Sequence, residues 1–323
     1  MDTSILVSSL ASPPVLFFFL GALAAWLRSD LEIPQPVPKL LSLYLLLAIG
    51  FKGGVELNRS GLETQMLITL GAALLVAVAM PIGTFVVLRK RLGTANAAAV
   101  AATYGSVSAV TFITAVTLLG QLQIPSSGWM VAAMALMESP AIVIGVLLAR
   151  RFGANEEGHA HGWGELLREA FFNGSVFVLV GSMVIGVITG PSGETALAPF
   201  TSGIFKGMLC LFLLDLGLVS ARRLAASREL RAVHCGYAIA APLVHGAIGV
   251  AIAWLLGLGR GDALLFTVLC ASASYIAVPA AMRLAIPQAS PGIYVPMALA
   301  ITFPFNVVFG LPLYLAVINH FWS

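Results

Sequence analysis

The sequence predicts an all-α membrane protein of ten transmembrane helices, arranged as two five-helix repeats of opposite orientation. Three observations predict this fold: an apolar composition, a one-sided distribution of basic residues, and similarities between the two halves of the chain. Of the 323 residues, 59% are hydrophobic and only 10% are charged, whereas soluble domains contain about 25% charged residues. The apolar runs are continuous over about 20 residues, the length of a transmembrane helix, and lack the alternation of a β-barrel strand.

Ten apolar segments follow one another along the chain, separated by polar or Pro/Gly-rich breaks such as IPQPVP at residues 33–38. The first is expected to be kept as a helix, because residues 1–14 lack the basic residues that begin a secretory signal peptide. The predicted spans are residues 10–27, 37–57, 66–88, 95–120, 128–149, 168–189, 203–220, 233–257, 262–285 and 292–318.

The basic residues predict the orientation of these spans. With the N-terminus outside, 13 of the 17 Lys and Arg residues fall on the cytoplasmic side, as the positive-inside rule requires. Both termini are therefore expected outside the cytoplasm. As a separate expectation, the protein is placed in the cytoplasmic membrane of a bacterium. The cytoplasmic residues are Arg28, Lys39, Arg89, Lys90, Arg91, Arg150, Arg151, Arg168, Arg222, Arg223, Arg228, Arg231 and Arg283.

One polar linker divides the chain into a first repeat at residues 1–149 and a second at residues 168–323. The linker, residues 150–167, contains His159 and His161, which we expect to be solvated rather than to bind a metal. Five spans is an odd number, so the second repeat must enter the membrane with opposite polarity. Inverted repeats of this kind are common in secondary transporters, where substrate binds near the midplane between discontinuous helices.

Four similarities between the halves support a duplication. Gly50 follows Lys39 by eleven residues, as Gly217 follows Lys206, and an Ile-Pro pair follows the fourth span of each half. MALMESP at residues 134–140 corresponds to MALAITFP at residues 297–304, and a Ser-x-Ser pair lies in each fourth span. Because the four occur in the same order, we interpret them as traces of one repeat.

The two Ser-x-Ser pairs lie in unusually polar stretches, residues 101–117 and 271–279. We expect both helices to be broken there, since the backbone amides that begin the second half of a broken helix favour an anion. The hydroxyls of Ser106, Ser108, Ser272 and Ser274 would then donate to a small oxyanion. Alternatively, these small residues serve only close helix packing.

Glu138 lies in the middle of the fifth span, where an unpaired carboxylate would be costly to bury. Na⁺ coordination, proton carriage and a structural ion pair are the three interpretations that remain open. Asn306 could supply a carbonyl oxygen to an ion, and Thr103 adds a hydroxyl to the first polar stretch. These three residues are the candidates for a Na⁺ site.

The chain lacks the HExxH, GxSxG, GxGxxG and Walker A motifs, and no nucleophile–base pair stands out, so we do not expect an enzyme. The net charge of +3 does not indicate nucleic-acid binding. Without a nucleotide-binding domain, transport would depend on an ion gradient or on the substrate's own gradient. The alternatives are a proton-coupled or uncoupled carrier of an organic acid, and a membrane sensor that signals through a cytoplasmic partner.

Six motifs together resemble the sodium-dependent bicarbonate transporter family, and the resemblance covers nearly the whole chain. They are GFKGG (50–54), YGSVSAVTF (104–112), MALMESPA (134–141), LLDLGLVSARRL (213–224), ASASYIAVPAAMR (271–283) and TFPFN (302–306). The resemblance implies a ten-helix fold of core and gate domains, usually a homotrimer in the lipid membrane. It also implies bicarbonate import with Na⁺ as the coupling ion, and inhibition by a cytoplasmic PII-like protein.

The resemblance also assigns residues. The first broken-helix site falls on Gly105, Ser106, Val107, Ser108 and Thr111, and the second on Ser272, Ala273, Ser274 and Tyr275. Glu138 falls where cyanobacterial members carry an aspartate, and Tyr275 stands where they have an acid after the serines. The linker is also shorter than theirs. The leading hypothesis is a Na⁺-coupled symporter for bicarbonate or another small anion.

Overall fold

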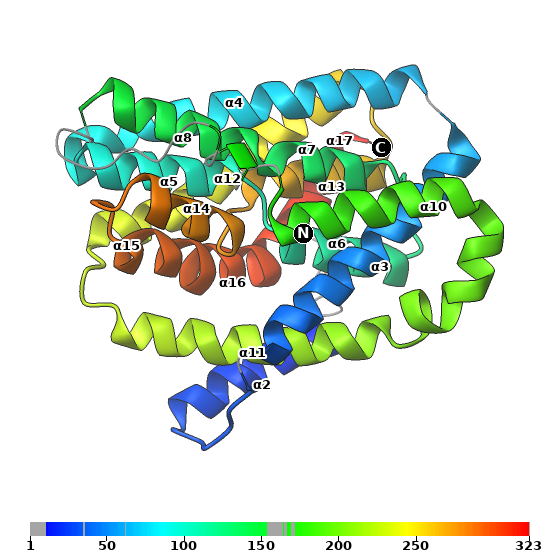
Figure 1. Cartoon of the computed structure of the whole chain (residues 1–323), viewed down its shortest axis with the longest axis horizontal. Coiled ribbons are helices and arrows are strands. Elements are labelled where there is room, and N and C mark those ends of the chain that lie inside the picture. The colour runs from blue at the N-terminus through cyan, green and yellow to red at the C-terminus, as the bar shows by residue number, and fades with distance from the viewer. Residues whose placement is uncertain are drawn as a thin grey trace.

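The computed structural model describes residues 11–34, 36–61, 63–153, 164, 167–168 and 172–322, and all regular elements within them are helical (Figure 1). His159 and His161 lie outside these residues. The helices are α2 (Pro13–Trp26), α3 (Pro36–Ser60), α4 (Thr64–Leu92), α5 (Thr94–Gly105), α6 (Ala109–Gln121), α7 (Met130–Glu138), α8 (Pro140–Arg151), α10 (Gly174–Ala198), α11 (Phe205–Ala226), α12 (Ala232–Leu255), α13 (Arg260–Ala271), α14 (Ala277–Ala285), α15 (Pro291–Pro296), α16 (Phe303–Phe305) and α17 (Leu311–Phe321).

Seven helical stretches in the described part of the chain are long and apolar enough to cross a membrane. A shorter apolar helix, Pro13–Trp26, precedes them. The chain is therefore a multi-pass membrane protein, as its composition predicts. The seven stretches are Pro36–Ser60, Thr64–Leu92, Thr94–Gln121, Met130–Arg151, Gly174–Ala226, Ala232–Leu255 and Pro291–Phe321.

Glycines bring two pairs of helices into backbone contact. A Cβ atom on Gly54 of α3 would lie 1.9 Å from the carbonyl oxygen of Met183 in α10, and one on Gly217 of α11 would lie 2.0 Å from that of Phe18 in α2. Any larger side chain would force the helices apart, which is why small residues line such contacts in membranes. Elsewhere in the bundle α4 packs on α5, and α12 on α13 (Figure 1).

Both polar stretches interrupt a helix. The chain leaves helical geometry at residues 106–108, between α5 and α6, and at residues 272–276, between α13 and α14. Ser108 caps α6, because its Oγ accepts a hydrogen bond of 3.2 Å from the amide of Thr111. Pro279 lies in the first turn of α14, where its missing N–H leaves no hydrogen bond unmade.

Candidate functional site

The two helix interruptions are joined by hydrogen bonds. The amide of Ser108 donates to Oγ of Ser272 over 2.9 Å, and the amide of Ser274 donates to the carbonyl oxygen of Thr103 over 2.9 Å. These contacts connect residues more than 160 positions apart in the chain. The interruptions that the sequence predicts therefore form one joint in the interior of the molecule, where all four residues are buried.

Hydroxyl groups surround Ser108 within this joint. Its Oγ accepts a hydrogen bond of 2.9 Å from Oγ1 of Thr111. Its own hydroxyl donates a longer hydrogen bond of 3.4 Å to the hydroxyl oxygen of Tyr275. Ser108, Thr111 and Tyr275 are thus brought together in space.

A cavity of about 30 Å³ lies beside the joint and is lined by Val107, Ser108, Glu138, Ser274 and Tyr275. A single water needs about 10–15 Å³ on the same measure. On this measure the cavity has room for two or three waters, or for an ion of a few atoms.

The beginnings of two helices point to this cavity. Ala109 and Val110 start α6, Ile276 and Ala277 adjoin the start of α14, and all four line it. Among the described residues that line it there is no Lys or Arg. Amides at a helix N-terminus carry partial positive charge and attract anions. The two helix beginnings therefore supply partial positive charge to this part of the wall.

Glu138 contributes an acidic side chain to the cavity wall, the only one among the described residues that line it. The residue is only 8% exposed, and within the described part of the chain its carboxylate makes no hydrogen bond or ion pair. Its backbone carbonyl is held in place, because Ser106 Oγ donates to it over 2.9 Å. This carbonyl is available because the amide of Ile142, its usual helical partner, bonds Ser139 instead at the break between α7 and α8.

Other predicted residues lie near the joint without lining the cavity. Gly105 packs against the ring of Pro81, where a Cβ would come within 2.5 Å. The hydroxyl of Thr103 donates to the carbonyl of Ala99 in its own helix, and Ala273 is buried. These positions shape and hold the joint.

Asn306 is engaged with protein atoms. Its Nδ2 donates to the carbonyl oxygen of Ala271 over 2.8 Å, at the end of α13, and its Oδ1 lies 3.0 Å from the hydroxyl of Tyr314. It does not line the cavity that contains Glu138. Of the three candidate Na⁺ ligands, only Glu138 does.

Sequence reasoning missed two polar lining residues, Ser42 and Ser175. They lie near the beginnings of α3 and α10. Each is a single serine in a mainly apolar segment, with no spacing that marks it. Only the packing of α3 and α10 against the joint assigns them to this cavity.

A comparison with curated protein sequences gives no match. A comparison with protein-family profiles gives one that spans residues 13–319, nearly the whole chain: the Na⁺-dependent bicarbonate transporter superfamily. This match confirms the resemblance that the six motifs carry, and favours a transporter over an enzyme. The chain belongs to the Na⁺-dependent bicarbonate transporter superfamily.

Proposed function

We propose that this protein takes up bicarbonate, or a similarly small anion, together with Na⁺ by alternating access. The observation that carries the proposal is the cavity of about 30 Å³ where two helix N-termini meet the carboxylate of Glu138. Its size suits a four-atom oxyanion and argues against a carrier of larger organic acids. The proposed anion ligands are the amides that begin α6 and α14, with the hydroxyls of Ser108, Ser274 and Tyr275.

Glu138 supplies a reason for coupling to Na⁺. A carboxylate in the wall of an anion site repels the anion, and burying it unpaired costs several kcal/mol. A Na⁺ ion bound to the carboxylate removes both costs, so each ion favours the binding of the other. Thr103 and Asn306 are proposed as further Na⁺ ligands. Their side chains are hydrogen-bonded to backbone carbonyls in this structure, so they would have to change conformation to reach the ion.

Ten membrane crossings account for the helices in the proposed topology. The stretch Gly174–Ala226 is 53 residues long, far more than one crossing needs. It divides at residues 199–203 into α10 and α11. Counting α2 and the interrupted pair α13–α14 as crossings then gives ten, with residues 1–149 and 168–323 as the two repeats.

The packing of α3 on α10 supports the inverted arrangement. Gly54 approaches Met183, and four residues on, Asn58 donates to the carbonyl of Val187 over 2.9 Å. Because both residue numbers rise together, α3 and α10 run parallel. The first helix of the second repeat thus runs with the second helix of the first repeat, as inversion requires.

The repeated glycines support the same arrangement. Gly50 packs α3 against α10, with a Cβ 2.5 Å from the carbonyl of Leu179, and Gly217 packs α11 against α2. Both glycines follow a lysine by eleven residues. Each glycine therefore lies in the second helix of one repeat and packs it against the first helix of the other repeat.

We propose that α2, α3, α10 and α11 form the gate and that the remaining helices form the core, which moves against it.

The surroundings of the protein are proposed from the family resemblance and from the charge distribution. They are the cytoplasmic membrane of a bacterium with both termini outside, a homotrimer, and a PII-like regulatory protein on the cytoplasmic side. A measurement of the mass of the protein in native membranes or nanodiscs tests the trimer directly.

Uptake of labelled bicarbonate into proteoliposomes tests the proposed function. At alkaline pH, where little of the label is membrane-permeant CO₂, we expect uptake that depends on an inward Na⁺ gradient and is lost when an ionophore dissipates it. Liposomes without protein are the control. Uptake that is the same with and without Na⁺ would reject the coupling, and absence of uptake would reject bicarbonate as the cargo.

A further inference from the structure

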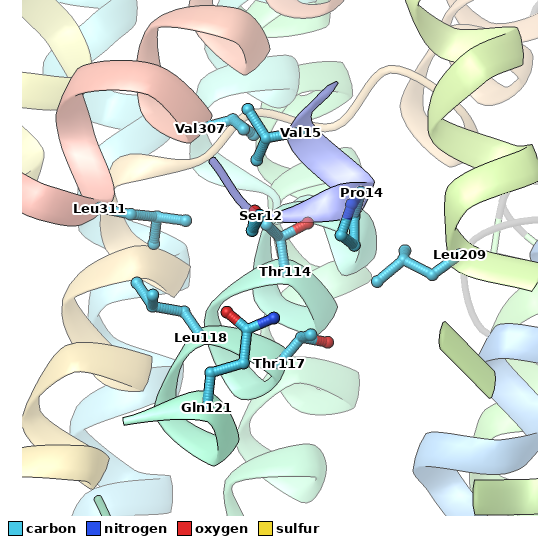
Figure 2. Close-up of a pocket in the computed structure, with 10 residues that line it drawn as sticks. All are labelled: Ser12, Pro14, Val15, Thr114, Thr117, Leu118, Gln121, Leu209, Val307 and Leu311. Carbon is cyan, nitrogen blue, oxygen red and sulfur yellow. The ribbon is translucent and has the colours of Figure 1, made fainter. Parts of the chain in front are cut away.

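A second cavity lies at the far end of α6 from Glu138. It measures about 10 Å³, room for about one water molecule. Figure 2 shows Thr114, Thr117 and Gln121 of α6 on one side of this space, and Ser12 and Pro14 at the start of α2 across from them. The cavity therefore lies between helices of the proposed core and the proposed gate.

A line of polar residues on α6 runs from the joint toward the second cavity. Thr111, Thr114, Thr117 and Gln121 follow one another at three- and four-residue spacing, which keeps them on one side of the helix. Thr111 is 1% exposed and Thr114 6%. Thr117 is partly buried and Gln121 is exposed. This face of α6 is thus polar from the joint to the surface, and its side chains become more exposed along the way.

The hydroxyls on this face suit water and hydrated ions. Thr114 donates to the carbonyl of Val110 over 2.8 Å, and Thr117 donates to that of Ile113 over 2.9 Å. Their donors are satisfied within the helix, which leaves oxygen lone pairs toward the cavity. Apolar side chains make up the rest of the wall and keep the space near the size of one water: Val15, Leu118, Leu209, Val307 and Leu311.

The two cavities face opposite ends of the bundle. Ser42 and Ser175, at the beginnings of the parallel helices α3 and α10, border the cavity that contains Glu138. The second cavity borders the end of α6. By the positive-inside rule, α3 and α10 begin at the cytoplasmic side and α6 ends at the external side.

We propose that the external access path to the anion site runs along the Thr111–Thr114–Thr117–Gln121 face of α6, between α6 and the α2–α11 pair. In this structure the path is closed down to a single water-sized space, and it widens when the core moves against the gate. This inference rests on the proposed transport function and adds the route that a hydrated ion takes from outside.

Cysteine accessibility tests the path. In a variant with Cys210, Cys235 and Cys270 replaced by alanine, Thr117→Cys is exposed to a membrane-impermeant quaternary-ammonium methanethiosulfonate on the external side. We expect it to react at least about tenfold faster than Val116→Cys, because only a thiolate that water reaches reacts. Val116 is also partly buried but packs against the apolar core and does not line the cavity.

Thr117→Cys that reacts no faster than Val116→Cys, while both react after denaturation, would overturn the path. The same proteoliposomes are assayed for bicarbonate uptake. Fast labelling without any uptake rejects bicarbonate as the cargo and leaves the path standing. Uptake with slow labelling rejects the path and leaves the function standing.

A blocking variant tests the path without the cysteine substitutions. Thr117→Phe is expected to lower the uptake rate by at least about tenfold, because a phenyl ring exceeds the space of one water. Stabilisation of the purified protein by Na⁺ should persist, since Glu138 is untouched. Thr117→Ser keeps the hydroxyl and should transport normally. Uptake by Thr117→Phe at the unsubstituted rate contradicts the path.

Discussion

Replacing Glu138 with glutamine removes the charge from the cavity wall while keeping the size of the side chain. The carboxylate is 8% exposed and makes no ion pair in the described part of the chain. In the absence of Na⁺, the unsubstituted protein must bear the cost of burying it, and the variant does not. We therefore expect the purified variant to be at least as thermally stable as the parent in Na⁺-free buffer.

The effect on Na⁺ follows from the same charge. A carboxylate and a monovalent cation about 4 Å apart attract each other by about 4 kcal/mol at an effective dielectric constant of ~20. Desolvation offsets part of this attraction, and we take the net loss as about 1.4–2.8 kcal/mol. Since 1.4 kcal/mol is a factor of ten, the Na⁺ concentration for half-maximal uptake should rise about 10- to 100-fold in Glu138→Gln.

Two measurements follow, and a second buried acid provides the control. Uptake is titrated with Na⁺, and the melting temperature is measured with and without Na⁺, because a bound ion stabilises the folded state. Asp215→Asn removes another buried carboxylate, 6% exposed, which does not line the cavity. It should leave the Na⁺ dependence unchanged. Unaltered Na⁺ dependence in Glu138→Gln would refute the assignment, and transport that survives but loses its pH dependence would indicate proton carriage instead.

Four further substitutions, one of them a control, test the joint and the helix packing. Gly54→Ala should destabilise the protein by about 1–3 kcal/mol, because its Cβ meets a backbone carbonyl at 1.9 Å, whereas Gly207→Ala, with open space around it, should stabilise it slightly; thermal melting distinguishes them. Ser272→Ala leaves the buried amide of Ser108 without its partner, at a cost of about 1–3 kcal/mol, and should lower both the melting temperature and uptake. Tyr275→Phe removes a proposed anion ligand together with the 3.4 Å hydrogen bond to Ser108, so the KM for the anion should rise about 5- to 10-fold; an unchanged KM would mean that the hydroxyl does not bind the anion.

Much of this architecture can be predicted from the sequence, because lipid constrains it so strongly. A backbone without water must satisfy its hydrogen bonds within helices, so apolar length alone predicts most of the helices. The two interruptions are also predictable, since Gly105, the Ser-x-Ser pairs and Pro279 are poor choices for a plain transmembrane helix. Their positions agree with the described structure to within a few residues.

The walls of the cavity could not be predicted in the same way. Ser42 and Ser175 reach it only because α3 and α10 pack across the joint, and no local pattern encodes a contact between distant helices. Asn306 illustrates the opposite error: a polar residue in an apolar segment predicts an ion ligand, but the structure satisfies its amide with Ala271 and Tyr314. A polar residue in a membrane helix indicates a partner without identifying it.

The two serine pairs are equivalent in sequence, but their contacts differ. The amide of Ser108 donates to Oγ of Ser272. If the two pairs made equivalent contacts, the amide of Ser274 would donate to Oγ of Ser106. Instead Ser274 bonds the carbonyl of Thr103, and Ser106 holds the carbonyl of Glu138.

These different contacts lead us to expect different roles for the two interruptions. The hydroxyl of Ser106 in the first holds the backbone carbonyl of Glu138, and the hydroxyl of Ser272 in the second holds the amide of Ser108 at the start of α6. Exchanging serine for alanine should therefore act differently at the two sites. Ser106→Ala should chiefly weaken the dependence of uptake on Na⁺, while Ser272→Ala should chiefly raise the KM for the anion. Equal effects of both variants on both ions would show that the joint acts as a single structural unit, with no division between cation and anion sites.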